Sequence, residues 1–264
     1  MQDSAIHLDD LRNQDGTTPA LLHRVRAALR PDTRSMTSQD WRHLVYLHWP
    51  AAPEALRPLL PPGVQLDLHR GRAWVSVVPH IAAAHRNTGS AQRDGEYAAI
   101  HVRTYVHAGG VPGIWYLSID ASSRLAVATG RLVTGLPFLF SQIRDTSDGS
   151  DIEYESVRQS GHHASHRVEA SIGQPTGLYM AGTLEHFLLE RYAIYGKHLG
   201  QLWRVRLHHP PLIARELKRV EVEDELISAA GLPGYAYPPP VSHYVAGVRI
   251  DFFAPHKIQP DVQI

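Results

Sequence analysis

The stretch from residue 100 to residue 137 constrains the fold of this chain more than any other segment. It begins with IHVRTYV, turns at Gly109-Gly110 and returns with IWYLSID. Two apolar, alternating runs on either side of a glycine turn predict a β-hairpin whose side chains point to two opposite faces. A helical pattern follows over residues 122–129, and the stretch closes on Gly130-Arg131 and Gly135-Leu136-Pro137. We therefore expect a β-rich protein built around this hairpin.

Polar side chains interrupt the apolar residues of this stretch at Arg103, Tyr105, Tyr116, Ser118 and Arg131. A buried guanidinium is costly without partners, so we expect these residues to share a cavity or a hydrogen-bonded network. The planar fork of Arg103 or Arg131 suits a carboxylate or an enolate, and the tyrosine and serine hydroxyls could orient a ligand oxygen. The alternative is structural: the arginines pair with an acidic residue, and the hydroxyls are satisfied at the edge of the core. Asp120 and Glu190 are the acidic residues that this alternative requires.

His101 is a candidate acid or base, because it shares a strand face with Arg103 and titrates near neutral pH. The other histidines do not suggest a metal site. Three of them, His162, His163 and His166, fall in a predicted loop, while His208-His209 point to opposite faces of a strand. No HExxH array, nucleophile elbow or nucleotide-binding glycine motif is present. We expect neither a metal nor a cofactor.

Strands dominate the rest of the chain. Alternation and turn residues predict further strands over 43–51, 64–68, 73–79, 138–143, 151–158, 166–172, 202–208, 214–222 and 244–253. Helical patterns are limited to 20–29, 53–60, 183–195 and 224–230, with an exposed loop at 83–95 and a proline-rich connector at 233–240. This pattern predicts a mainly β (α+β) fold: a single closed or nearly closed antiparallel β-barrel or double sheet with a few covering helices. We assign residues 36–264 to it and interpret residues 1–35 as a peripheral extension.

Composition excludes several classes of function. The 264 residues carry 26 basic and 26 acidic side chains, so no net field favours nucleic acid or an anionic membrane. Without cysteine there is no disulfide, thiolate metal site or cysteine nucleophile. No apolar run is long enough to span a bilayer, and no secretory signal pattern is present. A cytoplasmic location is the expectation, and a homo-oligomer is compatible with the sequence.

An ordered succession of segments between about residues 40 and 215 resembles the DUF2071 (YqjF-like) family. The segments are HLVYLHW, LRPLLPPGVQLDLHRGRAWVSVVPH, VRTYV, PGIWYLSIDASS, GRLVTGLPF, LEHFLLERYAIY and HHPPL. The resemblance implies the acetoacetate decarboxylase-like β-barrel fold. It also implies a carboxylate and an amide before the VRTYV segment, where this chain has Ala99 and His101.

The decarboxylases use a lysine that forms an imine with the substrate, and the resemblance places that lysine after a Gly-Arg-(three residues)-Gly-(aromatic)-Pro pattern. The comparable stretch here begins at Gly130, and Phe138 stands at the position of the lysine. Phenylalanine has no nucleophilic atom. Lysine occurs only at Lys197, Lys218 and Lys257, none of them near this stretch in sequence. We therefore do not expect Schiff-base decarboxylation.

Two functional hypotheses and one structural alternative remain. In the first, the chain binds a small anionic or carbonyl ligand in a cavity, held by Arg103 and Arg131. In the second, it is a lysine-independent lyase, hydratase or aldol-type enzyme for a small keto acid, in which the arginines stabilise an enolate and His101 transfers the proton. In the alternative, side chains fill the barrel and no ligand enters.

Overall fold

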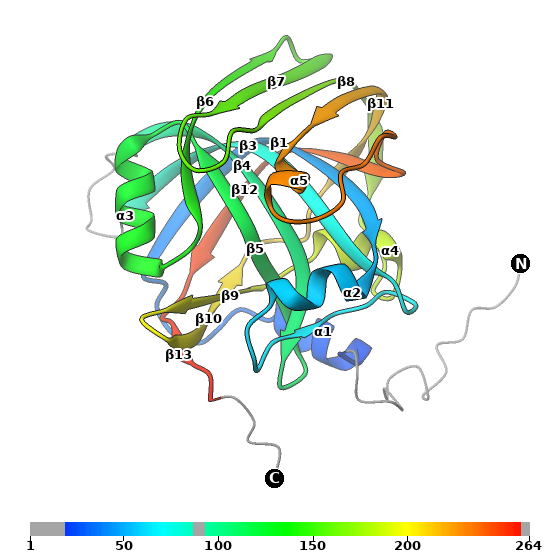
Figure 1. Cartoon of the computed structure of the whole chain (residues 1–264). Helices are drawn as coiled ribbons and strands as arrows, with labels where there is room; N and C mark the ends of the chain where they lie inside the picture. The colour runs from blue at the N-terminus through cyan, green and yellow to red at the C-terminus, as the bar shows by residue number, and fades with distance from the viewer. Residues whose placement is uncertain (1–18, 87–92, 260–264) are drawn as a thin grey trace, which may run out of the picture.

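The computed structural model describes residues 19–86 and 93–259, and most of them lie in strands (Figure 1). The strands are β1 (Thr37–Ala51), β2 (Gln65–Leu66), β3 (Ala73–Arg86), β4 (Arg93–Ala108), β5 (Val111–Ala121), β6 (Phe138–Ser147), β7 (Asp151–Arg158), β8 (Ser165–Gly177), β9 (Ala193–His198), β10 (Gln201–His208), β11 (Ala214–Asp224), β12 (Val241–Phe252) and β13 (His256–Lys257). The helices are α1 (Leu21–Ala28), α2 (Pro53–Leu56) with a 3-10 turn at Arg57–Leu59, α3 (Arg124–Thr134), α4 (Leu184–Leu189) and α5 (Leu226–Ala229).

All the strands belong to one sheet that curls into a partial ring. Its order is β13-β10-β9-β5-β6-β7-β8-β11-β12-β1-β3-β4-β2, with further pairings of β4 with β5 and of β10 with β12. Strands β12, β1, β3, β4 and β5 thus form a continuous wall (Figure 1). Two further runs of strands, β6-β7-β8-β11 and β9-β10, each connect β5 to β12, while β2 pairs with β4 and β13 with β10. The mainly β fold that the sequence predicts is confirmed.

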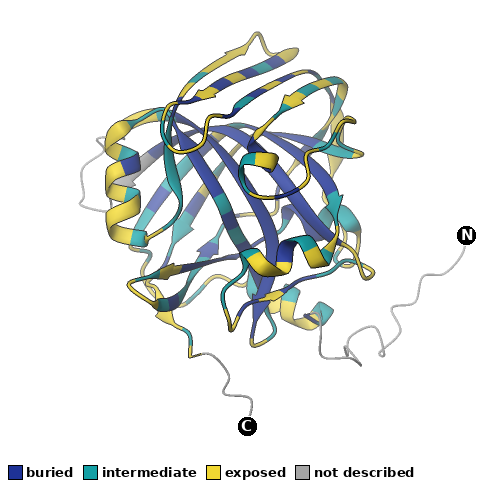
Figure 2. Ribbon diagram, viewed as in Figure 1, coloured by how far each residue is buried: buried dark blue, intermediate teal, exposed yellow. Residues whose placement is uncertain are grey.

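The wall is buried on both faces, as Figure 2 shows for β1, β3, β4 and β5. One face contributes Val45, Val77 and Val102 to a hydrophobic core that also takes side chains from β7, β8 and α5. The opposite face contributes Leu44 and Tyr105 to a second core, which α4, β9 and β10 complete. Because successive strand residues point to opposite faces, side chains along each strand alternate between the two cores.

Two joints of the sheet are parallel, which differs from the all-antiparallel expectation. β5 pairs in parallel with β6 through Ile119–Ala121 and with β9 through Ile114 and Trp115. The β5–β6 connection contains α3, and a helical crossover is what a parallel pair requires. Ser123 caps α3 by accepting a hydrogen bond from the Ala126 amide, and Gly135 ends it in the left-handed region at φ 67°.

Several predicted local structures were wrong in extent, and three of them are informative. The helical pattern over 183–195 gives only α4, because residues from Ala193 onward pair with β10 in β9. The ends of the loop predicted at 83–95 are strand, since β3 runs to Arg86 and β4 begins at Arg93, and its residues 87–92 lie outside the described residues. The helix predicted over 122–129 extends to Thr134. In the first two cases sheet pairing overrides local sequence preference.

The described part of the predicted extension contacts the rest of the chain. On α1, Arg24 makes two hydrogen bonds of 2.7 and 2.5 Å to the carboxylate of Asp67, which is fully buried. Just beyond α1, Arg30 forms an ion pair with Asp251. Whether residues 1–35 are dispensable for folding stays a prediction.

Candidate functional site

A cluster of polar side chains lies on the wall face that α4 covers. We call it the Arg103 cluster, and its members are Tyr46, His48, Ser76, His80, His101, Arg103, Tyr105, Tyr116 and His243. They occupy alternate positions of neighbouring strands, which is why one face collects them. Every member is at most 5% exposed. A polar cluster this deep inside a protein is expected to have a structural or chemical role.

The centre of the cluster is a guanidinium without a counterion. Arg103 is 3% exposed, and its Nη2 donates one long hydrogen bond of 3.4 Å to the carbonyl of Leu188. Its guanidinium carbon lies 5.3 Å from the ring centre of Tyr46 and 5.8 Å from that of Tyr105. Its Nε has no hydrogen-bond partner, and no carboxylate among the described residues forms an ion pair with it.

The acidic residues that the structural alternative requires are engaged elsewhere. Asp120 pairs with Arg158. Glu190 accepts hydrogen bonds from the Tyr192 hydroxyl and, at 2.8 Å, from the amide of Leu212. Neither forms an ion pair with Arg103.

A hydrogen-bonded chain fixes one side of the cluster. The Tyr105 hydroxyl donates to the Leu188 carbonyl at 3.0 Å and lies 2.7 Å from Ser76 Oγ, which lies 2.7 Å from His48 Nδ1. Because the only proton of Tyr105 goes to Leu188, Ser76 donates to Tyr105 and accepts from Nδ1–H of His48. Nε2 of His48 is then an acceptor, and it has no partner.

The histidines around Arg103 are neutral at neutral pH. Burial, helped by the charge of Arg103, lowers the pKa values of His48 and His101 well below the usual range. Burial also lowers the pKa of His80 and that of His243 to about 4. The phenols of Tyr46 and Tyr116 stay neutral too, since burial raises the pKa of Tyr46 to about 12 and also raises that of Tyr116. Arg103 therefore carries the charge of this cluster alone.

Of the site residues predicted from sequence, His101, Arg103, Tyr105 and Tyr116 come together in this cluster. His101 packs against the rings of His80 at 4.4 Å and Tyr116 at 4.8 Å between centroids, and its Nδ1 has no partner. His48, Ser76, His80 and His243 belong to the same cluster, but sequence reasoning missed them. For His48 and Ser76, alternation along the predicted strands was the available signal. His80 and His243 each lie one residue outside the strands predicted over 73–79 and 244–253.

Ser118 lies on the opposite face of the wall, which corrects the expected grouping. Arg103 pairs with Tyr116 and Val102 with Ser118, so Leu117 is an extra residue in β5, a β-bulge. The extra residue shifts the alternation of side chains along β5 by one position. Tyr116 and Ser118 therefore face different cores, although they are two residues apart.

Arg131 does not join the cluster either. It lies exposed on α3 and donates from Nε to the carbonyl of Phe138 at 2.6 Å. The ring of Phe138 packs against α3, where a Cβ atom at Gly130 would lie 2.5 Å from it.

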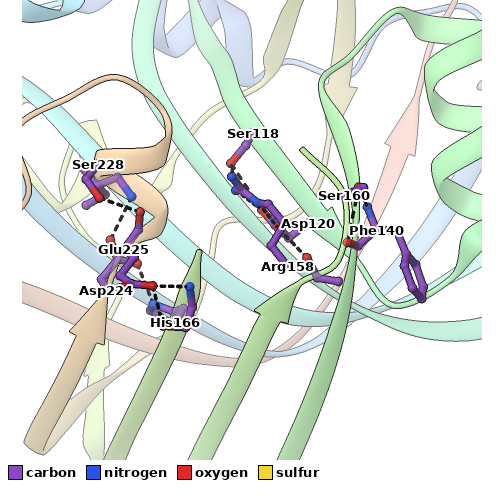
Figure 3. A network of polar contacts seen from close by, with 12 residues as sticks. Ser118, Asp120, Phe140, Arg158, Ser160, His166, Asp224, Glu225 and Ser228 are labelled. Atoms are coloured by element: carbon purple, nitrogen blue, oxygen red, sulfur yellow. Dashed lines mark hydrogen bonds and ion pairs between the residues drawn. The ribbon is translucent and has the colours of Figure 1, made fainter. Parts of the chain in front are cut away.

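Ser118 belongs to a second polar network, which Figure 3 shows with its ion pair. Arg158 donates from Nε and Nη2 to the two carboxylate oxygens of Asp120 at 2.8 and 2.7 Å. Ser141 donates to the same carboxylate at 2.5 Å, and Ser118 Oγ accepts from Arg158 at 3.2 Å. This arginine is 4% exposed and fully compensated. We call these four residues the Asp120 network.

No three metal-ligating side chains gather closely enough to hold an ion in the described ranges 19–86 and 93–259. Nor does any helix of that part have the length and hydropathy to cross a membrane.

Comparison with known proteins identifies relatives across most of the chain. The DUF2071 family model, described as an uncharacterized conserved protein, matches residues 38–249. The uncharacterized protein YqjF of Bacillus subtilis (strain 168) is 30% identical over 232 residues, which cover 86% of this chain and 94% of YqjF.

Similar solved structures agree with the fold. The enduracididine biosynthesis enzyme MppR, complexed with pyruvate, has a TM-score of 0.61 at 12% identity and covers 87% of this chain and 93% of its own. An acetoacetate decarboxylase-like enzyme from Sphingomonas wittichii RW1 has a TM-score of 0.58 at 16% identity, with 88% and 98% covered. At such low identity these structures establish the acetoacetate decarboxylase-like fold alone.

Proposed function

The chain belongs to the DUF2071 family, and from the geometry of the Arg103 cluster we propose that it binds a small carboxylate. The observation that carries this proposal is the buried guanidinium of Arg103, which has a free Nε and no carboxylate partner among the described residues. A buried charge costs several kcal/mol unless it is paired, so an anionic ligand would supply what the chain does not.

The surroundings of Arg103 favour a carboxylate that also carries a carbonyl or hydroxyl oxygen. A guanidinium binds a carboxylate through two parallel hydrogen bonds. Tyr46 and Tyr116 are protonated phenols near that guanidinium and are able to donate to a further oxygen. The fold relative MppR has been solved with pyruvate, a ligand of this chemistry. Small 2-keto acids are therefore the first ligands to test.

The segment between β8 and α4 contacts the cluster, and we expect a ligand to enter there. Tyr179 of this segment packs edge-on against His243, with 5.5 Å between ring centroids. Gly177 and Gly182 flank it with φ values of 81° and 97°, and a Cβ at either glycine would meet no atom within 4 Å. Tyr179 would move aside to admit a ligand.

A thermal-shift titration tests the proposal. Pyruvate, acetate and acetone separate the contributions of the carboxylate and the carbonyl, and they are compared in wild type, Arg103→Met and Arg131→Ala. Pyruvate is expected to stabilise wild type by about 2.7 kcal/mol at a hundred times its dissociation constant. The same gain is expected in Arg131→Ala, the control arginine on the surface, and none in Arg103→Met. Equal stabilisation of Arg103→Met would contradict the proposal.

A second candidate function is proton transfer by His101 on the bound keto acid. It is favoured by the unpartnered Nδ1 of this neutral imidazole, which leaves a nitrogen free for a substrate proton. Exchange of the pyruvate methyl protons for deuterium, followed by NMR, would report it. His101→Ala is expected to abolish the exchange and to leave pyruvate binding largely unchanged. Exchange at the wild-type rate in His101→Ala would exclude His101 as the base.

A further inference from the structure

A pocket of about 270 Å³ lies at the fork where β6 and β9 separate from β5. β5 pairs with β9 at Trp115 and with β6 from Ile119. In the described pairings, residues 116–118 therefore have no strand partner on this edge, and the bulge residue Leu117 is at the centre of the gap. The α3–β6 turn closes one side, and its Gly135 packs so tightly that a Cβ would lie 2.7 Å from the carbonyl oxygen of Lys197.

Strand alternation places four side chains on the pocket side of the fork. Trp115 and Tyr195 are register partners in β5 and β9, so they share a face. Leu117 lies two residues after Trp115, and Lys197 lies two residues after Tyr195, so both also lie on that face. All four line the pocket. Leu59 and Ala230, from the segments after α2 and α5, line it as well.

The chemistry of this lining is apolar and aromatic with a single cation. Of the described residues that line the pocket, Lys197 alone carries a charge, and it is exposed. Trp115 is half-buried and offers aromatic surface, which favours a ring or a branched apolar group, whereas the ring of Tyr195 is fully buried beneath it. An unpaired strand edge adds backbone polar groups that a ligand oxygen is able to satisfy.

We propose that this fork pocket is a second binding site, for a small aromatic carboxylate whose ring lies against Trp115 and Leu117 and whose carboxylate meets the ammonium of Lys197. The site is independent of the Arg103 cluster. Tyr116 touches both, but its neighbours Trp115 and Leu117 point away from Arg103. The contact with Lys197 is an ion pair, and no covalent bond forms.

Isothermal titration calorimetry with three probes of one shape tests this site: phenylacetate, 2-phenylethanol and phenethylamine. Wild type is expected to bind phenylacetate most tightly and phenethylamine most weakly. In Lys197→Ala the affinity for phenylacetate is expected to fall about fivefold, the effect of one partly solvated ion pair. Lys197→Glu is expected to reverse the preference toward phenethylamine. Both substitutions are at an exposed position, so the fold should tolerate them.

Two control variants distinguish this site from the rest of the molecule. Lys218→Glu, which inverts an exposed charge on β11, should leave all three affinities unchanged. Arg103→Met should retain phenylacetate binding even if it loses pyruvate binding. The proposal is overturned if wild type fails to bind phenylacetate, if Lys197→Glu keeps the wild-type preference, or if Arg103→Met abolishes phenylacetate binding.

Discussion

Two arginines are buried to nearly the same extent, but their surroundings differ. Arg158 is 4% exposed and forms a two-pronged ion pair with Asp120. Arg103 is 3% exposed and has aromatic rings, neutral histidines and one carbonyl around it. A one-residue bulge in β5 places Asp120 and Ser118 on the face of the sheet opposite to the one that holds Arg103 of β4. Because the chain builds a complete ion pair around Arg158, the unpaired guanidinium of Arg103 is a candidate binding group.

Removing the carboxylate from the complete pair should have the largest effect. Asp120→Ala leaves Arg158 buried without a counterion, and breaking such a pair typically costs about 3–5 kcal/mol. Chemical denaturation of wild type and variant measures this loss. A decrease in the free energy of unfolding below about 1 kcal/mol would show that solvent already compensates the charge of Arg158. The two buried arginines would then not differ in how far the protein itself compensates them.

Lowering the pH should destabilise the protein through the buried histidines of the Arg103 cluster. The pKa values of His80 and His243 are about 4 in the folded protein, below the usual value of 6.5, so the unfolded chain binds protons first. The free energy of unfolding should therefore fall as the pH drops below about 6.5, by roughly 3 kcal/mol for each histidine at pH 4. In His80→Gln the denaturation midpoint should vary less between pH 6.5 and pH 4. An unchanged slope would mean that His80 is not held neutral.

A carboxylate introduced beside Arg103 should form an ion pair with its guanidinium. In His101→Glu the new side chain lies on the same strand face as Arg103, two residues away. It should compete with the ligand and weaken pyruvate binding by about tenfold or more, or about 1.4 kcal/mol. His80→Gln, which adds no charge to the same cluster, is the control in the binding titration. Unchanged pyruvate affinity in His101→Glu would place the ligand away from Arg103.

The smallest effect is expected at a third buried pair. Asp67 has two partners, Arg191 at 2.5 Å and Arg24 from α1, so removal of one still leaves an ion pair. A chain beginning at Met36 should fold and lose about 1 kcal/mol of stability, because it loses the part-exposed Arg24 and the surface ion pair of Arg30 with Asp251, while Arg191 still pairs with Asp67. Circular dichroism and chemical denaturation would show this. Failure of that chain to fold would mean that residues 1–35 are integral.

Strand alternation allowed the sequence to predict most of the fold and four of the nine residues of the Arg103 cluster. The hairpin of β4 and β5, and the face that holds His101, Arg103 and Tyr105, follow from a period of two. The bulge at Leu117 was not predictable from that period, and it moved Ser118 to the other face. Arg131 was misplaced because α3 continues through Gly130 and turns it toward solvent.

Contacts between distant segments were also beyond the sequence. Arg158 is 38 residues from its ion-pair partner Asp120, and His48 is 28 residues from its hydrogen-bond partner Ser76. These partners depend on how β5, β6 and β7 pair, and on how β1 pairs with β3. Alternation identifies which face a residue occupies, but pairing order decides what it meets there.

The central claim is that Arg103 lacks a counterion until an anion binds. The most direct test compares the free energy of unfolding of wild type and Arg103→Met, each with and without saturating pyruvate. Without ligand, the variant should be at least as stable as wild type, because an apolar side chain replaces an unpaired buried charge. With pyruvate, only wild type should gain stability. A loss of about 3–5 kcal/mol in the unliganded variant would contradict the account, because Arg103 would then have a structural partner of its own.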